Sequence, residues 1–124
     1  MTLDMDTLVS AFSEDPRVML ATLFGSAKDG VVRPGSDVDI GVLLSPALTP
    51  LEFYTFYVEL TAKLSSIPEL DLIDLNHAGS VLAFEALCGH RLFVRNNEVV
   101  ATFSSRVARE YESDILHAAA HLAA

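Results

Sequence analysis

The chain has 124 residues, is 51% hydrophobic and carries a formal net charge of −9 at pH 7, so it suits one folded domain and is too apolar for a disordered chain. The acidic balance argues against nucleic acid as the main partner, because phosphate backbones are bound by clustered Lys and Arg, and it suits a protein that binds cations or a basic partner surface. Without an N-terminal signal segment or an apolar stretch of membrane-spanning length, we expect a cytoplasmic protein with a single domain over residues 1–124 and no membrane contact.

The first part of the chain predicts one helix and two strands. Apolar residues recur at helical spacing over residues 5–12, and Pro16 ends this predicted helix. The apolar run "RVMLATLFG", residues 17–25, has the length and composition of a buried strand. A loop over residues 26–36 contains a Pro-Gly turn signal, and "DVDIGVLL", residues 37–44, predicts the second strand.

The rest of the chain alternates helices with strands. Thr49 and Glu52 form a capping box at the start of a predicted helix, and Pro68 closes that segment. Gly89 is expected as the C′ residue of a short helix, and the apolar neighbours of Cys88, the only cysteine, predict a core position for it. The predicted elements after Pro68 are a strand at 70–75, a short helix at 80–88, an edge strand at 91–94 and a long helix from about residue 97. Interleaved strands and helices indicate an α/β or α+β class, with a small mixed sheet flanked by helices.

The apolar stripe of the final helix has two interpretations. Its members recur at helical spacing and are Val100, Phe103, Val107, Tyr111 and Ile115. In the first interpretation the stripe covers an open edge of the sheet, and in the second part of it meets a partner protein or a second copy of the chain. His117 and His121 lie one turn apart on this helix, but without a third ligand nearby in the sequence we interpret them as surface residues.

Two aspartates lie at the start of the second predicted strand. Asp37 and Asp39 are two residues apart, so their side chains leave the same face of a strand with Cα atoms about 6.5 Å apart. Two such carboxylates can hold a divalent cation, and Mg²⁺ prefers oxygen ligands. The alternative is a solvent-exposed strand start. We favour the cation site, because the Gly25-Ser26 pair about ten residues upstream is a turn whose N–H groups can hold phosphate oxygens.

This part of the chain resembles the signature of the DNA polymerase beta-type nucleotidyltransferase superfamily, which consists of F-G-S, a loop of about ten residues and S-D-x-D. The short length points to its minimal nucleotidyltransferases, the MNT proteins often paired with a HEPN partner. The resemblance covers roughly residues 18–95 and implies the fold of that superfamily. It also implies that Asp37 and Asp39 bind the metal ions and act in catalysis. The residues to which it assigns nucleotide binding are Gly25, Ser26 and Ser36.

A third carboxylate is implied by the same resemblance, on the strand at 70–75, where it activates the attacking hydroxyl and binds one metal ion. Asp71 and Asp74 are the two candidates. They are three residues apart and face opposite sides of a regular strand, so only one of them can join the site. We favour Asp71, because the acid of this family comes early in the strand. Asp74 then lies on the other face or at the strand end.

The implied activity is transfer of AMP from ATP to a hydroxyl, with two Mg²⁺ ions as cofactors and a HEPN toxin as the partner that receives AMP, so that the protein acts as an antitoxin. The alternative is a catalytically silent binding module of the same fold that neutralises its partner by contact. The presence of both aspartates and of a third acid favours the enzyme over the binding module. Asp29 stands where relatives often carry a basic residue, and Lys28 or Arg33 is the candidate replacement for the lost phosphate contact.

Overall fold

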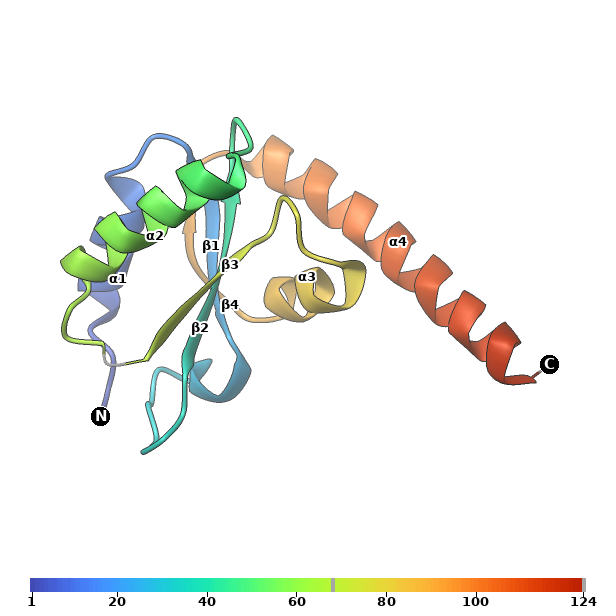
Figure 1. Ribbon diagram of the computed structural model, residues 1–124, viewed down its shortest axis with the longest axis horizontal. Helices are drawn as coiled ribbons and strands as arrows, with labels where there is room; N and C mark the ends of the chain where they lie inside the picture. Colours follow the sequence, from blue (N-terminus) through green and yellow to red (C-terminus); the bar gives the residue numbers. More distant parts are fainter. Residues whose placement is uncertain (68, 124) are drawn as a thin grey trace.

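A four-stranded mixed sheet lies at the centre of the computed structural model, which describes residues 1–67 and 69–123 (Figure 1). Pro68 and its expected role in closing a helical segment lie outside the described residues. The strand order is β3-β2-β1-β4, with β1 antiparallel to both of its neighbours and β2 parallel to β3. The strands are β1 (Val18–Phe24), β2 (Val38–Leu44), β3 (Leu70–Asp74) and β4 (His90–Val94).

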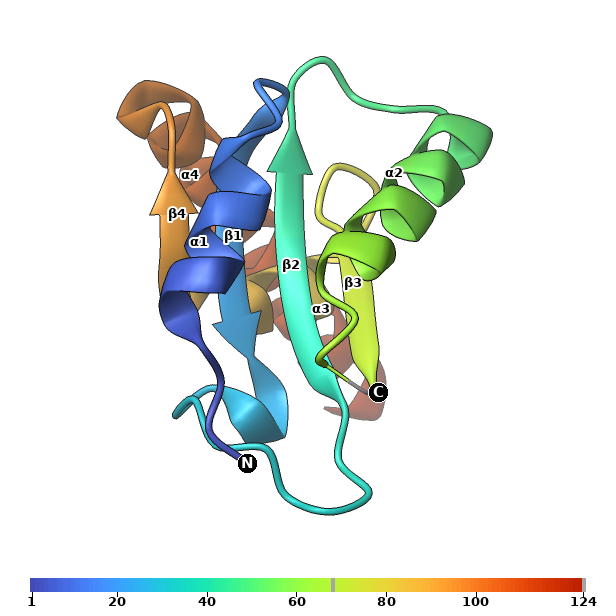
Figure 2. The same ribbon diagram turned by 90° about the vertical axis from the view of Figure 1, so that its left-hand side faces the viewer.

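Helices cover both faces of this sheet. Figure 2 shows α1 (Met5–Ser13) and α2 (Pro50–Lys63) in front of the strands, with α3 (Ser80–Leu87) and α4 (Asn97–Ala123) behind them. A short 3₁₀ turn, η1 (Gly25–Ala27), follows β1. Each face has its own cluster of buried apolar residues, one with α1 and α2 and one with α3 and α4. This arrangement confirms the α+β class and the edge position predicted for the fourth strand.

Residues of β2 alternate between the two cores. Ile40 and Val42 belong to the cluster under α1 and α2, whereas Leu43 packs in the cluster under α3 and α4. Gly41 also faces α3, because a Cβ there would lie 3.1 Å from the Cβ of Ala86. A side chain at Gly41 would therefore push α3 away from the sheet. Odd-numbered residues of β2 accordingly face α3, which sets the direction of the aspartates at the start of the strand.

The capping box predicted at Thr49 is present at the start of α2. The Thr49 hydroxyl accepts a hydrogen bond from the Glu52 N–H at 3.2 Å, and the Glu52 carboxylate accepts one from the Thr49 N–H at 2.9 Å. Phe56 and Leu60 of this helix are buried against the sheet. Reciprocal capping of this kind satisfies two N–H groups that the first helical turn otherwise leaves unpaired.

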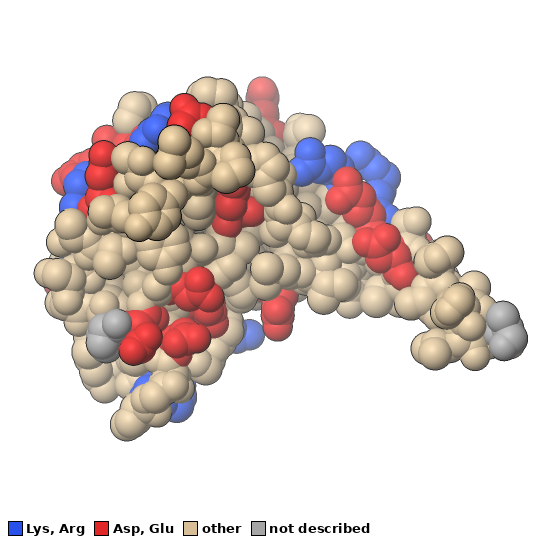
Figure 3. Space-filling view, viewed as in Figure 1, with Lys and Arg blue, Asp and Glu red and all other residues tan. Residues whose placement is uncertain are grey.

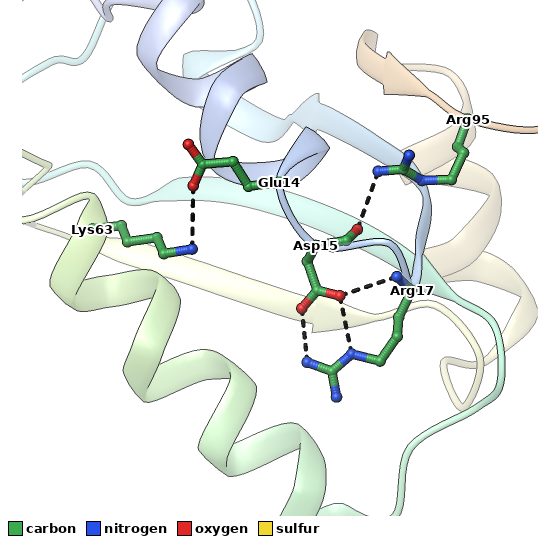
Figure 4. Close-up of polar contacts among 5 residues, drawn as sticks. All are labelled: Glu14, Asp15, Arg17, Lys63 and Arg95. Atoms are coloured by element: carbon green, nitrogen blue, oxygen red, sulfur yellow. Dashed lines mark hydrogen bonds and ion pairs between the residues drawn. The ribbon is translucent and has the colours of Figure 1, made fainter.

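Polar contacts join the end of α1 to α2 and β4 (Figure 4). Arg17 forms a two-point ion pair with Asp15, its Nη2 lying 2.7 Å from Oδ2, and Lys63 lies 3.4 Å from Glu14. Arg95 donates to the backbone oxygen of Asp15 at 3.1 Å. The hydrogen bond from Arg17 lowers the pKa of Asp15. Each partly exposed pair of this kind contributes at most about 1 kcal/mol, so these contacts orient α1 more than they stabilise the domain.

The segment after α3 differs from the sequence-based expectation in two ways. Cys88 is exposed rather than buried, because it is the C-cap residue at the surface end of α3. Gly89 follows this cap as expected, but its φ is not positive. The requirement for glycine has another cause, since a Cβ at this position would collide with the backbone oxygen of Leu23. Close approach of α3 to β1, rather than a left-handed turn, selects glycine there.

The final helix α4 packs on the domain from its start to about Asp114. Val100, Phe103 and Val107 are buried, and the Tyr111 ring stacks on Phe84 with 4.2 Å between centroids. The same chain therefore covers this part of the stripe, but it does so with α3 and one face of the sheet at β1, not with the open sheet edge that the first interpretation predicts. His117 and the other residues in the range 112–123 are exposed. None of the helices in the described ranges is long and apolar enough to cross a membrane.

Candidate active site

Two carboxylates meet where β2 and β3 run side by side. Asp39 is the register partner of Asp71 in this parallel pair, so the two side chains leave the same face of strands about 4.8 Å apart. That face is the one covered by α3, as Gly41 shows two residues further along β2. Asp37 comes immediately before β2 and is exposed, and Asp39 is half-buried. The structure thus pairs Asp39 with Asp71 on neighbouring strands, with Asp37 two residues before Asp39.

The Gly25 turn lies directly against the Asp39 carboxylate. Gly25 has a φ of +72°, and a Cβ there would collide with Oδ2 of Asp39. Phe24, the last residue of β1, is the register partner of Asp39 in β2, which explains why the turn emerges beside it. Gly25 and Ser26 are both exposed. A phosphate held by this turn would therefore lie next to the carboxylate, with no side chain between the backbone and the ligand.

Arg33 holds the loop that follows this turn. Its guanidinium donates to the backbone oxygen of Ser26 at 2.9 Å and forms an ion pair with Asp29, also at 2.9 Å. The hydrogen bond from Arg33 lowers the pKa of Asp29. Half-buried Ser36 donates its N–H to the backbone oxygen of Arg33 at 3.0 Å, which closes the turn before Asp37. Arg33, a candidate phosphate contact in the sequence, is thus engaged within its own loop.

Asp74 lies away from the other aspartates. It is three residues beyond Asp71 on β3, and its carboxylate accepts a hydrogen bond from the Asn76 N–H at 3.1 Å. His77 Nδ1 lies 2.8 Å from the second carboxylate oxygen of Asp74. Asn76 in turn bonds the backbone of Leu44 at the end of β2. The carboxylate of Asp74 is therefore occupied in the turn after β3, and Asp71 is the acid of this strand that lies beside Asp39.

Burial and neighbouring acids together raise the pKa of Asp39 above the usual value. Burial is the largest cause, followed by the negative charges of Asp71, Asp37 and Glu85. Glu85 lies on α3 and was not singled out in the sequence, because nothing in its local pattern distinguishes it from a solvent-facing helical residue. A cluster of negative charges next to a half-buried carboxylate favours the binding of a cation.

The donor set fits Mg²⁺, which prefers hard oxygen ligands and commonly keeps waters or phosphate oxygens in its shell. Within residues 1–67 and 69–123, however, no group of three or more Asp, Glu, His or Cys side chains is close enough together to coordinate a metal ion. Unneutralised carboxylates repel one another, so an open arrangement is expected before a cation binds. Asp37, Asp39 and Asp71 thus offer a partial shell that oxygens from a bound phosphate can complete.

Asp39→Asn is expected to raise the melting temperature at pH 7, by about 1–4 °C, and to change it little near pH 4. The raised pKa means that the folded state binds this proton more tightly than the unfolded chain does. The stability contributed by the proton is therefore lost as the pH rises from the unfolded value of 3.8 through the folded pKa. Asparagine carries no charge and avoids this loss.

Thermal unfolding in EDTA at the two pH values tests this expectation. Asp6→Asn, an exposed position on α1, controls for the removal of one negative charge. A shift of equal size at pH 4 and pH 7 in the Asp39 variant would contradict the electrostatic explanation.

Comparison with known proteins identifies the family of this chain. A family model described as Polymerase beta, Nucleotidyltransferase matches residues 6–98. The protein adenylyltransferase MntA of Shewanella oneidensis is 36% identical over 67 residues, which make up 54% of this chain and 47% of that protein. The match thus spans about half the length of this curated relative.

Solved structures share the fold over nearly the whole chain. A crystal structure of a toxin–antitoxin with AMP-PNP matches 97% of this chain and 96% of its own, with a TM-score of 0.78 and 23% identity. A structure of tri-AMPylated Shewanella oneidensis HEPN toxin in complex with MNT antitoxin matches 95% and 92%, with a TM-score of 0.71 and 21% identity. The family model spans all four strands and the acidic residues of the site. The chain therefore belongs to the polymerase beta-type nucleotidyltransferase family.

Proposed function

We propose that this protein is a Mg²⁺-dependent nucleotidyltransferase that moves AMP from ATP onto a hydroxyl of a partner protein. The observation that carries the proposal is the shared register of Asp39 and Asp71 on parallel strands, with the Gly25 turn in contact with Asp39. The name of the relative, protein adenylyltransferase MntA, supports AMP as the transferred group. The AMPylated HEPN toxin in a structure of the same fold supports a HEPN protein as the partner and an antitoxin role. We place this reaction in the cytoplasm, where ATP is available.

Each residue of the site has a part in this reaction. Asp37 and Asp39, with Asp71, supply the carboxylate oxygens that would hold Mg²⁺. When bound, Mg²⁺ supplies positive charge that offsets the charge of the triphosphate. Gly25 and Ser26 are exposed, and their backbone N–H groups and the Ser26 hydroxyl would hold phosphate oxygens, whereas Ser36 closes a separate turn immediately before Asp37.

Asp71 is the proposed general base. It lies on the edge strand β3 and is exposed, so an acceptor hydroxyl from a partner can reach it. Its carboxylate takes the proton of that hydroxyl as the oxygen forms a bond to the α-phosphorus of ATP. The bond from that phosphorus to the bridging oxygen breaks, and pyrophosphate leaves with its electron pair. AMP then remains on the acceptor oxygen.

Asp71→Asn is expected to keep nucleotide binding and to lower AMP transfer by about a hundredfold or more, because the amide keeps the shape but cannot accept the proton. Asp74→Asn should leave transfer nearly unchanged, since Asp74 is committed to the turn after β3. Intact-mass spectrometry of a purified HEPN-domain protein that binds this chain, after incubation with ATP and Mg²⁺, measures the added adenylyl groups.

Two outcomes would contradict the proposal. Loss of transfer in the Asp74 variant, with normal transfer in the Asp71 variant, would mean that the wrong face of β3 carries the base. If the complex forms tightly but the mass of the partner never changes with any nucleotide or metal, the chain is a binding module that neutralises its partner by contact.

A further inference from the structure

The end of α4 extends beyond the domain. The last supporting contacts along this helix are the stack of Tyr111 on Phe84 and a hydrogen bond from the Ser80 hydroxyl to Asp114. Residues 115–123, here called the α4 arm, are all exposed, and in Figure 1 this part of the helix runs away from the sheet. At 1.5 Å per residue the arm is about 13 Å long.

The arm continues the apolar stripe that packs on the domain. Ile115, Ala118 and Leu122 follow Tyr111 at spacings of four, three and four residues, so they lie on the helix face that is covered further back. Ile115 is 46% exposed and Leu122 is 86% exposed. The arm contains no Asp, Glu, Lys or Arg, and its tip in Figure 3 carries neither red nor blue atoms. An apolar, uncharged helix face that projects into water is typical of a surface that another protein covers.

A groove lies between the base of this arm and the carboxylates. It is lined by Val81, Phe84, Glu85, Cys88 and Tyr111. Glu85 is next to Ala86, which packs against Gly41 on the face of β2 from which Asp39 also projects, so one wall of the groove lies on the helix that covers the site. Figure 3 shows the molecular outline curving inward between the body of the domain and the end of α4. A protein seated on the arm would therefore face the carboxylate edge of the sheet.

Charge decides which protein fits this surface. A second copy would bring another chain of net charge −9, and its own acidic site, against the groove that contains Glu85. Like charges brought together across an interface oppose association, whereas a surface with basic residues around an apolar patch would be attracted. The complementary occupant is thus a partner with an apolar patch for Ile115 and Leu122 and basic residues opposite Glu85.

We propose that the α4 arm and the adjoining groove are the docking surface for the partner protein that receives AMP. The arm binds an apolar patch of the partner, and the groove directs the acceptor hydroxyl toward Asp71. This inference rests on the proposed function, because it takes the acceptor of that reaction as its occupant. In this proposal the arm provides affinity for the partner and the carboxylates provide the chemistry. A variant can therefore lose partner binding without losing the transfer reaction, and the reverse.

The double variant Ile115→Glu and Leu122→Glu tests the docking surface. We expect its affinity for the purified HEPN-domain protein to fall about tenfold or more, because buried apolar side chains near an interface centre carry much of the binding energy. The KM for the partner should rise, while the affinity for ATP with Mg²⁺ and the melting temperature stay unchanged. The matched control is Leu51→Glu with Val58→Glu, two exposed apolar residues on α2, across the sheet from the arm. Calorimetry and intact-mass spectrometry at varied partner concentration give these values.

Three outcomes are informative. Unchanged partner affinity in the arm variant overturns the proposal. A wild-type dimer that the arm variant converts to a monomer by light scattering, with partner binding intact, also overturns it and makes a second copy the occupant. If the arm variant loses the partner but wild-type protein never transfers AMP, the docking surface stands and the proposed reaction fails.

Discussion

Asp37→Ala and Asp39→Ala are each expected to abolish Mg²⁺-dependent binding of ATP and to lower AMP transfer by at least about a hundredfold. Each variant removes one of the few carboxylates available to the cation at this edge of the sheet. The domain should fold normally, because Asp37 is exposed and Asp39 is only half-buried, with other acids rather than cations around it. Isothermal calorimetry with ATP, with and without Mg²⁺, measures the effect.

Glu59→Ala provides the control for this experiment, since Glu59 is an exposed acid on α2, on the other face of the sheet. It removes the same charge and should leave nucleotide binding unchanged. Wild-type affinity for ATP with Mg²⁺ in both aspartate variants would be incompatible with a metal site at Asp37 and Asp39.

Gly25→Ala is expected to lower AMP transfer by about a hundredfold, although it adds a single methyl group. Two effects combine at this position. The φ of +72° disfavours any residue with a Cβ, at a cost of about 1–2 kcal/mol, and the new methyl group would collide with Oδ2 of Asp39. Relief of this collision requires the turn or the carboxylate to move, and either movement separates the proposed phosphate contact from the metal ligand.

Gly30→Ala separates the two effects. Gly30 has a φ of +83°, but a Cβ there would meet no atom within 4 Å, so this variant carries the backbone strain without the collision. We expect a similar loss of melting temperature in both variants and a large loss of transfer in the Gly25 variant alone. Steady-state transfer rates and thermal unfolding make the comparison, and equal rates in the two variants would rule out the steric explanation.

Local features of this chain follow from the sequence. The capping box at Thr49, the strand-length apolar runs and the turn at Gly25 depend on residues close together in the chain, and the structure contains all of them. The two-residue spacing of Asp37 and Asp39 sets their common direction for the same reason, since side chains alternate along any strand. Alternation likewise excludes Asp71 and Asp74 from serving on one face together.

The tertiary structure decides whether Asp71 or Asp74 lies beside Asp39. This choice depends on the register of β3 against β2, which pairs Asp71 with Asp39, and register is set by the packing of the whole sheet. The approach of Glu85 to Asp39 and the exposure of Cys88 depend in the same way on where α3 packs.

The sequence by itself determined the period and composition of the stripe on α4, from Val100 to Ile115 and beyond. Only the tertiary structure decided that the domain covers it as far as Tyr111 and leaves the α4 arm exposed. The physical reason is that an apolar stripe on a helix is stabilised when another surface covers it. It does not specify whether that surface comes from the same chain, because burial of apolar area stabilises both arrangements alike.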